Sequence, residues 1–366
     1  MIVVGAGIVG CTIAYELAQS GAPVHVIETR APGQGATRAS AGILAPHIEG
    51  HGSDLLRSLG SRSLGLYDDF LTRLRRDSGR EVFYQRNGTF ELAFSDSDVE
   101  RLGDLSDTIR KEGIEARWIA PEDFADFEPL ASSSARGGLL IPTHGFVGVT
   151  SMTLAAAAAA EKSGARITAA TGAIKIHALA GDRVGVQTSS RMLEADRVVL
   201  AAGSWSSAIT VEGADPVPVK PIRGQLIQLQ SEPGAIRRVM WGPDGYLVPW
   251  PDGSVLVGST VEDVGFDEAH TFEAVDKLRA AAVSLVPSLA AAQMTGIRTG
   301  LRPKGPDDLP ILGRSTAVPG LIYATAHYRN GVLFTPLTVQ LVRDLVFDHP
   351  ADPALRDLDP ARVGRL

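Results

Sequence analysis

Three glycines and a glutamate near the start of the chain have the spacing of a dinucleotide-binding site. Gly5, Gly7 and Gly10 form the pattern Gly-x-Gly-x-x-Gly directly after an apolar run at residues 2–4. In this pattern the first glycine permits a tight turn, the second lets the backbone approach a pyrophosphate and the third lets a helix pack closely on the sheet. Glu28 follows 18 residues after Gly10, where a carboxylate typically accepts ribose hydroxyls. The spacing predicts an anion at the helix N-terminus.

The hydrophobic pattern predicts the elements that position these residues. Residues 2–4 fit a buried strand, apolar residues continue at helical spacing to residue 18, and residues 23–27 fit a second strand. Gly21 is expected to end the helix in a left-handed conformation. The resulting order is the β-α-β unit of a Rossmann-type fold. An ordinary glycine-rich turn is the less favoured alternative, because strand, helix, second strand and acid all occur in order.

Other segments favour a flavin dinucleotide over NAD, which shares the first unit. Residues 33–42 form a long loop of small side chains, which would let the backbone lie close to a flat ring and a diphosphate. Residues 196–204 and 320–326 fit further buried strands, and the second leads into His-Tyr-Arg-Asn-Gly at 327–331 and then a helix. Nucleotide-contacting pieces are therefore expected at both ends of the chain.

The middle of the chain predicts an antiparallel sheet. Asn87-Gly88 lies between strand-like residues 82–86 and 89–94, which is a strong hairpin signal. Ser95 and Asp98 predict the start of a helix that ends at Gly113. Further strands are expected at 224–230, 246–250 and 254–258, and helices at 150–163 and 272–286.

The expected fold class is α/β, with a Rossmann-type nucleotide-binding domain interleaved with an antiparallel-sheet α+β substrate domain. The strand-rich parts lie between the nucleotide-binding parts, so the nucleotide-binding domain is discontinuous. We assign it residues 1–84, 146–216 and 297–366, and assign the substrate domain residues 85–145 and 217–296.

Composition excludes several classes of protein. The 366 residues are 44% hydrophobic and carry a net charge of -7 without a basic run, so nucleic acid is not an expected partner. No apolar run approaches the length of a membrane span, and Cys11 is the single cysteine, which fits a reducing cytoplasm. Cys11 is expected to be a packing residue. His47 and His51 are four apart, but Pro46 and Gly50 disfavour a regular helix there, so no metal site is expected.

Several blocks of the sequence resemble the FAD-dependent amine oxidases of the D-amino acid oxidase group, and within it the glycine oxidases. The resemblance covers nearly the whole chain. The blocks are Val-Val-Gly-Ala-Gly-Ile-Val-Gly at 3–10, Ala-Ser-Ala-Gly-Ile-Leu at 39–44, Asn-Gly-Thr-Phe-Glu-Leu-Ala-Phe-Ser at 87–95, Gly-Leu-Arg-Pro at 300–303, Leu-Pro-Ile-Leu-Gly at 309–313 and Ala-His-Tyr-Arg-Asn-Gly-Val-Leu at 326–333. The first block is common to many flavoproteins, whereas the blocks from residue 300 onward are more specific to glycine oxidase-like members.

The resemblance implies a non-covalent FAD cofactor. Relatives with covalent flavin attach it through a cysteine in the C-terminal half, where this chain has none. The glycine motif and the matching positions give the expected cofactor-binding residues. They are Gly5, Gly7, Ile8, Val9, Gly10, Glu28, Thr29, Ala36, Thr37, Ala41, Gly42, Ile43, Ile174, Gly203, Arg302, His327, Tyr328, Arg329, Asn330, Gly331, Val332 and Leu333.

Three residues are the expected substrate-binding and catalytic groups. An amino-acid oxidase must hold a carboxylate so that the Cα–H bond points at flavin N5, and a planar guanidinium does this better than an ammonium group. By resemblance, Arg302 meets the substrate carboxylate, Tyr246 adds a hydroxyl hydrogen bond and Arg329 lies beside the pocket. The alternatives are a surface or inter-domain salt bridge for Arg302, a core aromatic role for Tyr246, and a structural or flavin-holding role for Arg329.

The implied reaction oxidises glycine or an N-substituted glycine. Hydride passes from the α-carbon to flavin N5, the imine hydrolyses to glyoxylate plus ammonia or a free amine, and O2 is reduced to H2O2. Asp244 and Val261 differ from what glycine oxidases carry, and a short Val261 is expected to leave space for a substituent on nitrogen. The alternatives are a D-amino acid dehydrogenase that passes electrons to a quinone or another carrier, and a non-catalytic flavin-binding protein. The family suggests a homo-oligomer.

Overall fold

A six-stranded sheet forms the centre of the nucleotide-binding part. The computed structural model describes residues 1–49 and 53–366. The strand order is β20 (Ile311–Arg314), β21 (Leu321–Thr325), β13 (Val198–Leu200), β1 (Ile2–Val4), β2 (His25–Ile27) and β9 (Arg166–Thr168). All pairs are parallel except β20 with β21. The strands predicted at residues 2–4, 23–27, 196–204 and 320–326 are thus confirmed as neighbours in one sheet.

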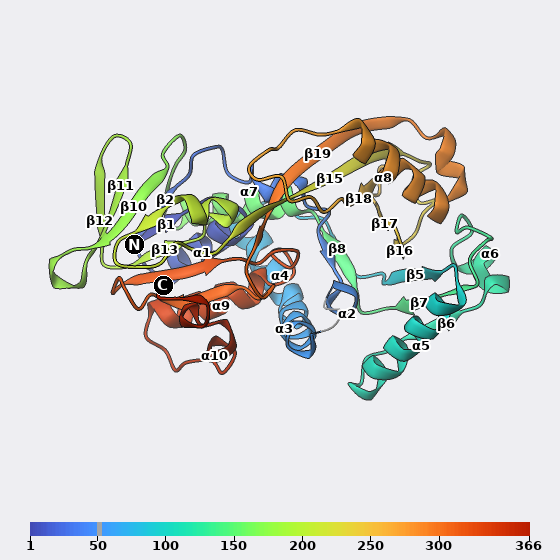
Figure 1. The fold of residues 1–366 in the computed structure, drawn as a ribbon, viewed down its shortest axis with the longest axis horizontal. Helices are drawn as coiled ribbons and strands as arrows, with labels where there is room; N and C mark the ends of the chain where they lie inside the picture. Colours follow the sequence, from blue (N-terminus) through green and yellow to red (C-terminus); the bar gives the residue numbers. More distant parts are fainter. Residues whose placement is uncertain (50–52) are drawn as a thin grey trace.

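Strand alternation lets this sheet bury both faces. Val3, Val26 and Val199 face one core, which they share with α1 (Ile8–Gln19), α7 (Val149–Lys162) and α9 (Thr335–Val346). Ile2 and Val198 face a second core under a four-stranded sheet. That sheet has the order β12 (Met192–Ala195), β11 (Val184–Thr188), β10 (Ala173–Ala178) and β14 (Thr210–Val211). Figure 1 shows the resulting layers. They confirm the Rossmann-type part of the predicted fold class.

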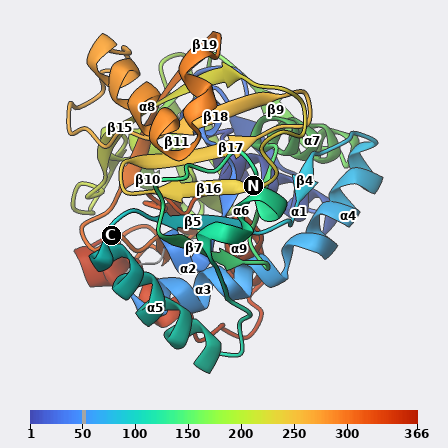
Figure 2. The ribbon, with the colours of Figure 1, turned by 90° about the vertical axis from the view of Figure 1, so that its right-hand side faces the viewer.

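An eight-stranded sheet forms the second part of the molecule. Its order is β19 (Met294–Lys304), β15 (Lys220–Gln230), β18 (Ser254–Gly258), β17 (Gly245–Pro249), β16 (Val239–Gly242), β5 (Thr89–Ala93), β7 (Gly137–Ile141) and β6 (Arg117–Ile119). It is antiparallel apart from β16 with β5. Figure 2 shows β18, β17, β16, β5 and β7 side by side. Helix α8 (Phe272–Leu285) packs on one face through Leu278, Ala282 and Leu285.

The long pair of strands β15 and β19 places Arg302 in the eight-stranded sheet. β15 and β19 pair over nearly their whole length, from Lys220 opposite Lys304 to Leu229 opposite Met294. β19 runs from Met294 to Lys304, so the domain boundary predicted at residue 297 falls inside this strand. Arg302 lies on the eight-stranded sheet, opposite Ile222. The assignment of residues to two domains stays a prediction.

The predicted hairpin at Asn87-Gly88 is wrong. A three-stranded sheet joins β3 (Ile43–Leu44), β8 (Gly145–Val147) and β4 (Tyr84–Gln85), whereas β5 pairs with β7 and β16. Gly88 does adopt a positive φ of 89°. Its N–H, however, donates to the His144 carbonyl, and the Asn87 amide donates to the Arg237 carbonyl. The two residues therefore carry the chain from one sheet to another, because their partners come from distant segments.

The remaining elements surround these sheets. The helix predicted after Ser95 is confirmed as α5 (Asp96–Lys111), where the Ser95 hydroxyl accepts from Asp98 N–H and the Asp98 carboxylate accepts from Ser95 N–H. Gly113 follows with a φ of 79°. The other helices are α2 (Pro46–Glu49), α3 (Asp54–Gly65), α4 (Tyr67–Ser78), α6 (Phe124–Phe127) and α10 (Leu355–Leu358), with 3-10 turns at Ala36–Ala39, Pro121–Asp123, Ala180–Asp182, Gly203–Ala208, Pro287–Ala291 and Pro360–Val363. None of the helices described in residues 1–49 and 53–366 is both long and apolar enough to span a bilayer.

The packing of α1 on the sheet gives a testable prediction. A Cβ added at Gly10 would lie 1.9 Å from the Gly5 carbonyl oxygen, so Gly10→Ala should destabilise the protein by about 1 to 3 kcal/mol or more. A Cβ added at Gly103, within α5, would meet no other part of the protein within 4 Å, so Gly103→Ala should instead stabilise by about 0.5 to 1 kcal/mol. Urea unfolding of the two variants against the parent checks both signs, and an unchanged midpoint in Gly10→Ala would contradict this packing.

Candidate functional site

One cavity extends between the six-stranded and eight-stranded sheets and collects most of the predicted site residues. Its walls come from the β1–α1 turn, the ends of β2 and β13, the loop at 35–43, strands β15, β17 and β19, and the loop at 327–332. The predicted residues in its wall are Gly5, Gly7, Ile8, Val9, Glu28, Thr29, Ala36, Thr37, Ala41, Gly42, Ile43, Gly203, Tyr246, Arg302, His327, Tyr328, Arg329, Gly331 and Val332. Segments far apart in sequence thus meet around one space.

Four predicted cofactor residues do not line this cavity. Ile174 is 51% exposed and lies where the β10–β11 register shifts between Ala173 and Lys175, so it does not share the buried face of Ile176. Gly10 lies behind the glycine turn, against Gly5. Asn330 and Leu333 are buried beneath their loop. The structure therefore does not place these four residues in the cavity wall.

Glycines in this wall pack so closely on neighbouring backbone that a side chain would not fit. Gly5 has a φ of 105°, and a Cβ there would lie 2.5 Å from the Ala201 carbonyl oxygen. The Thr37 hydroxyl accepts a hydrogen bond of 3.0 Å from Ile8 N–H at the start of α1. A Cβ at Gly42 would come within 2.0 Å of the Val147 carbonyl oxygen. Gly5, Gly7 and Gly42 line the cavity where a pyrophosphate is expected.

Glu28 is held at the end of β2 with its carboxylate in the cavity wall. Oε2 accepts from Ala6 N–H at 2.7 Å, and Oε1 accepts from Arg30 N–H at 2.9 Å and from the Thr29 hydroxyl at 3.0 Å. These bonds fix both oxygens beside the glycine turn. The arrangement fits the ribose of a dinucleotide, since a carboxylate has further lone pairs for hydroxyl donors.

Sequence reasoning missed Arg30 and Trp205, which also line this end of the cavity. The Arg30 guanidinium lies 4.7 Å from the centre of the Trp205 ring and makes two bonds, of 3.0 and 2.5 Å, to the Glu268 carboxylate. The sequence signal for Arg30 was its position two residues after Glu28, which places it near the same end of the cavity. Glu268 could not be connected with it, because the contact joins segments 238 residues apart.

Two glycines make room for the predicted substrate-binding residues. A Cβ at Gly224 would lie 2.3 Å from both terminal nitrogens of Arg302. A Cβ at Gly258 would lie 2.5 Å from the Tyr246 hydroxyl oxygen. Since these glycines lie on β15 and β18, the sheet surface is hollowed where Arg302 and Tyr246 reach the cavity.

Arg302 is oriented by two neutral acceptors that sequence reasoning also missed. Its Nη1 donates to the Thr260 carbonyl at 2.9 Å, and its Nη2 donates to the Ser259 hydroxyl at 2.8 Å. Tyr246 is 7% exposed, and its ring centre lies 4.8 Å from that of Trp241. Both side chains are held by neighbours and border the cavity, as carboxylate binding would require.

The loop at 327–332 brings Arg329 to the same cavity. Tyr328 N–H donates to the Pro303 carbonyl at 2.9 Å, so this loop is attached to β19 directly after Arg302. Ala326 and Tyr328 have positive φ values of 60° and 46°, which make the turn tight. Arg329 is exposed and lines the cavity.

His327 supports this loop from beneath. It is 3% exposed, and its Nε2 shares a hydrogen bond of 3.0 Å with the Thr338 hydroxyl on α9. Burial lowers the pKa of His327 to about 4, because the charged imidazolium would lose its hydration. The ring is therefore neutral near pH 7, which suits a structural role.

Several other expectations concern residues outside the cavity. Cys11 is fully buried, its thiol donates to the Ala6 carbonyl at 3.3 Å, and burial raises its pKa to about 12, as a packing residue requires. His47 is buried and bonds His144 at 2.8 Å, while His51 lies outside the described residues.

Asp244 is exposed, and Val261 is 53% exposed outside the cavity wall, so the expectation that Val261 shapes the pocket finds no support. Among described residues, no cluster of His, Cys, Asp and Glu could hold a metal.

The space above Gly224 gives a prediction with a matched control. Gly224→Ala should displace the Arg302 guanidinium and weaken binding of a carboxylate ligand by about tenfold or more, since a charge-assisted pair contributes about 1.5 to 3 kcal/mol. Gly296→Ala, on the paired strand, places its Cβ 3.9 Å from the nearest atom and should leave binding unchanged. Titration with acetate, followed through the flavin spectrum, measures both. Equal affinities in the two variants would contradict the proposed position of Arg302.

The buried imidazole predicts a pH-dependent stability. His327 takes up a proton below its ordinary pKa of 6.5 when unfolded, but only near 4 when folded. Its contribution to stability is therefore complete above pH 6.5 and falls by about 3 kcal/mol as the pH drops to about 4. His327→Gln keeps a hydrogen bond to Thr338 but cannot titrate. Unfolding measured from pH 7 to 4 should decline less steeply in this variant than in the parent, and parallel curves would refute the assignment.

Comparison with known proteins identifies the family. Residues 1–345 match the DAO family of FAD dependent oxidoreductases. The bifunctional protein ThiO/ThiG of Nostoc sp. is 32% identical over 363 residues, which cover 97% of this chain and 54% of that protein. The chain thus spans about half the length of the curated ThiO/ThiG relatives it matches.

Solved structures show the same fold. The crystal structure of glycine oxidase from Geobacillus kaustophilus superposes with a TM-score of 0.94 at 28% identity, covering 99% of this chain and 98% of that one. The crystal structure of iminodiacetate oxidase (IdaA) from Chelativorans sp. BNC1 gives a TM-score of 0.87 at 26% identity, with 98% of each chain covered. Together with the glycine turn, the Glu28 carboxylate and the cavity that joins them to Arg302, these matches show that the chain belongs to the DAO family of FAD-dependent oxidoreductases, of the glycine oxidase type.

Proposed function

We propose that this protein is an FAD-dependent oxidase of glycine or an N-substituted glycine. The observation that carries the proposal is the position of Arg302 in the wall of the same cavity as the glycine turn and Glu28. A cofactor bound along this cavity from Glu28 would extend toward Arg302, Tyr246 and Arg329. A small substrate with one carboxylate fits that end, because a guanidinium recognises a carboxylate through two parallel hydrogen bonds.

Each of the three residues has a distinct task in this proposal. Arg302 binds the carboxylate and fixes the direction of the Cα–H bond. Tyr246 donates a hydroxyl hydrogen bond to the same carboxylate, and Arg329 adds positive charge at the cavity wall. Bound FAD supplies the oxidising chemistry by accepting a hydride from the substrate. The protein thus contributes chiefly binding and orientation, which lower the barrier by fixing a reactive geometry.

The products follow from the substrate class. Loss of a hydride from the α-carbon and of a proton from the nitrogen converts glycine to an imine, which water hydrolyses to glyoxylate and ammonia, or to glyoxylate and a free amine when nitrogen is substituted. We propose O2 as the electron acceptor, with H2O2 as its product. Similarity to iminodiacetate oxidase supports the substituted substrates, since iminodiacetate is glycine with a second carboxymethyl group on nitrogen. Val261 is exposed outside the cavity wall and therefore does not shape this end of the cavity.

Anaerobic titration tests cofactor and substrate together. Glycine, sarcosine, larger N-alkyl glycines and D-alanine are added to the yellow protein while the oxidised flavin band is followed. We expect glycine or its N-substituted derivatives to bleach the band, and D-alanine to do so more slowly. Reduction by bulky D-amino acids but by no glycine derivative would refute the substrate assignment.

The same samples separate the two alternatives. Admission of air after reduction should restore the band and yield one H2O2 for each amine oxidised. Reduced flavin that is stable in air but reoxidised by a quinone would identify a dehydrogenase. A yellow protein that no amine bleaches would identify a non-catalytic flavoprotein.

A further inference from the structure

The segment at 259–271 carries both acceptors that orient Arg302. It follows β18 and leads to α8, and it contains no helix and a single bridge pair, between Glu262 and Arg223. Several of its side chains are exposed, including Val264 and Phe266. An irregular segment can hold a guanidinium in one place only if it is itself fixed, so the contacts that fix it bear on the position of Arg302.

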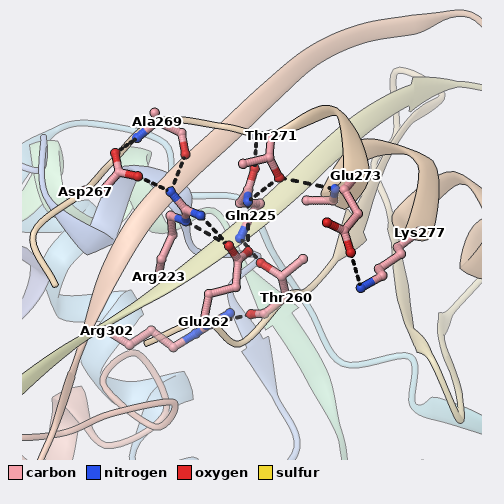
Figure 3. Close-up of polar contacts among 11 residues, drawn as sticks. Arg223, Gln225, Thr260, Glu262, Asp267, Ala269, Thr271, Glu273, Lys277 and Arg302 are labelled. Atoms are coloured by element: carbon pink, nitrogen blue, oxygen red, sulfur yellow. Dashed lines mark hydrogen bonds and ion pairs between the residues drawn. The ribbon is translucent and has the colours of Figure 1, made fainter. Parts of the chain in front are cut away.

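Arg223 is the first of these contacts. Its side chain is 5% exposed and is bound entirely to the segment. Nε and Nη2 donate to Glu262 Oε2 at 3.0 and 2.5 Å, and Nη1 donates to Asp267 Oδ2 at 2.5 Å and to the Ala269 carbonyl at 2.9 Å. The backbones of Arg223 and Glu262 also exchange two hydrogen bonds, of 2.8 and 3.0 Å. Figure 3 shows this guanidinium surrounded by the segment.

Gln225 makes the second set of contacts. Its amide nitrogen donates to Glu262 Oε1 at 2.8 Å and to the Thr271 hydroxyl at 3.3 Å, and its amide oxygen accepts from Thr271 N–H at 2.9 Å. Its backbone N–H donates to the Thr260 hydroxyl at 2.9 Å. Gln225 therefore connects the end of the segment with Thr260, whose carbonyl binds Arg302.

Strand alternation separates this network from the space that Arg302 occupies. Arg223 and Gln225 point to one face of β15, while Gly224 between them leaves space for Arg302 on the other. The network can therefore fix the segment without entering the cavity. None of the three side chains Arg223, Gln225 and Glu262 lines the cavity wall.

Glu262 is the residue on which the network converges. One oxygen binds Arg223 and the other binds Gln225. Burial opposes ionisation of Glu262, but hydrogen bonds from Thr260, Arg223 and Gln225 outweigh it and hold the pKa of the carboxyl below its usual value. A carboxylate with both oxygens occupied in this way is a fixed anchor for its neighbours.

We propose that Glu262, together with Arg223 and Gln225, is a positioning residue that fixes Ser259 and Thr260, and through them the Arg302 guanidinium, for the substrate carboxylate. This inference rests on the proposed function, in which Arg302 binds that carboxylate. Glu262 acts through Thr260 and touches neither substrate nor cofactor.

Glu262→Gln tests the proposal, with Asp267→Asn as its matched control. Each variant replaces one of the two carboxylates that pair with Arg223 by a neutral amide of the same shape. Only Glu262 also contacts Gln225 and Thr260, whereas Asp267 otherwise accepts only from Ala269 N–H. On the holoenzyme we expect the Kd for acetate and the KM for glycine to rise about tenfold in Glu262→Gln, with kcat changed much less. Asp267→Asn should change both by less than about twofold.

FAD content and the thermal unfolding midpoint of both variants are measured alongside, because a merely structural role would lower these without a selective loss of acetate affinity. If Glu262→Gln does not fold, Thr260→Val carries the test, since it removes the hydroxyl while keeping the carbonyl that binds Arg302. Equal effects in the Glu262 and Asp267 variants, or an unchanged acetate Kd in the first, would overturn the inference. Failure of glycine derivatives to reduce the parent flavin would overturn only the proposed substrate, because acetate affinity still reports on Arg302.

Discussion

The space above Gly224 determines where the positive charge of the cavity lies. A methyl group there would occupy the position of the Arg302 guanidinium, at 2.3 Å from both terminal nitrogens. In the β15–β19 pair Gly224 lies opposite Gly300, and Gly300 precedes Arg302 by two residues. The register of β15 with β19 therefore sets the position of both the space at Gly224 and the guanidinium that fills it. A shift by one residue would turn Arg302 to the other face of the sheet.

This register also connects the two parts of the molecule. β19 ends at Lys304, and Tyr328 N–H binds the Pro303 carbonyl, so the loop that carries Arg329 follows the end of the long strand. That loop follows β21, and its His327 bonds Thr338 on α9, so both supports belong to the part that contains the six-stranded sheet. The glycine-turn end and the Arg302 end of the cavity consequently have a fixed relation, as the proposed hydride transfer would require.

Local sequence signals predicted the glycine turn and the capped helix, but not the contacts around Arg302. Gly5, Gly10 and the helix capped by Ser95 depend on neighbours a few residues away, and the structure has them as expected. The hairpin predicted at Asn87-Gly88 does not form, because β4 pairs with β8 and β5 pairs with β7. Ser259 and Glu262 gave no signal at all. Their roles depend on Arg302 and Arg223, which reach them only after β15, β18 and β19 have paired.

The two arginines of this region differ in the charge of their partners, and that difference matters for binding. Arg223 is buried against the carboxylates of Glu262 and Asp267, which neutralise it and make it a structural link. Arg302 is oriented by a hydroxyl and a carbonyl, which accept hydrogen bonds without cancelling its charge. Neutral acceptors can hold a guanidinium in place while its field still attracts an anionic substrate, whereas carboxylate partners would compete with that substrate. The network of Glu262 keeps its carboxylates on the far face of β15, while Ser259 and Thr260 offer neutral acceptors to Arg302.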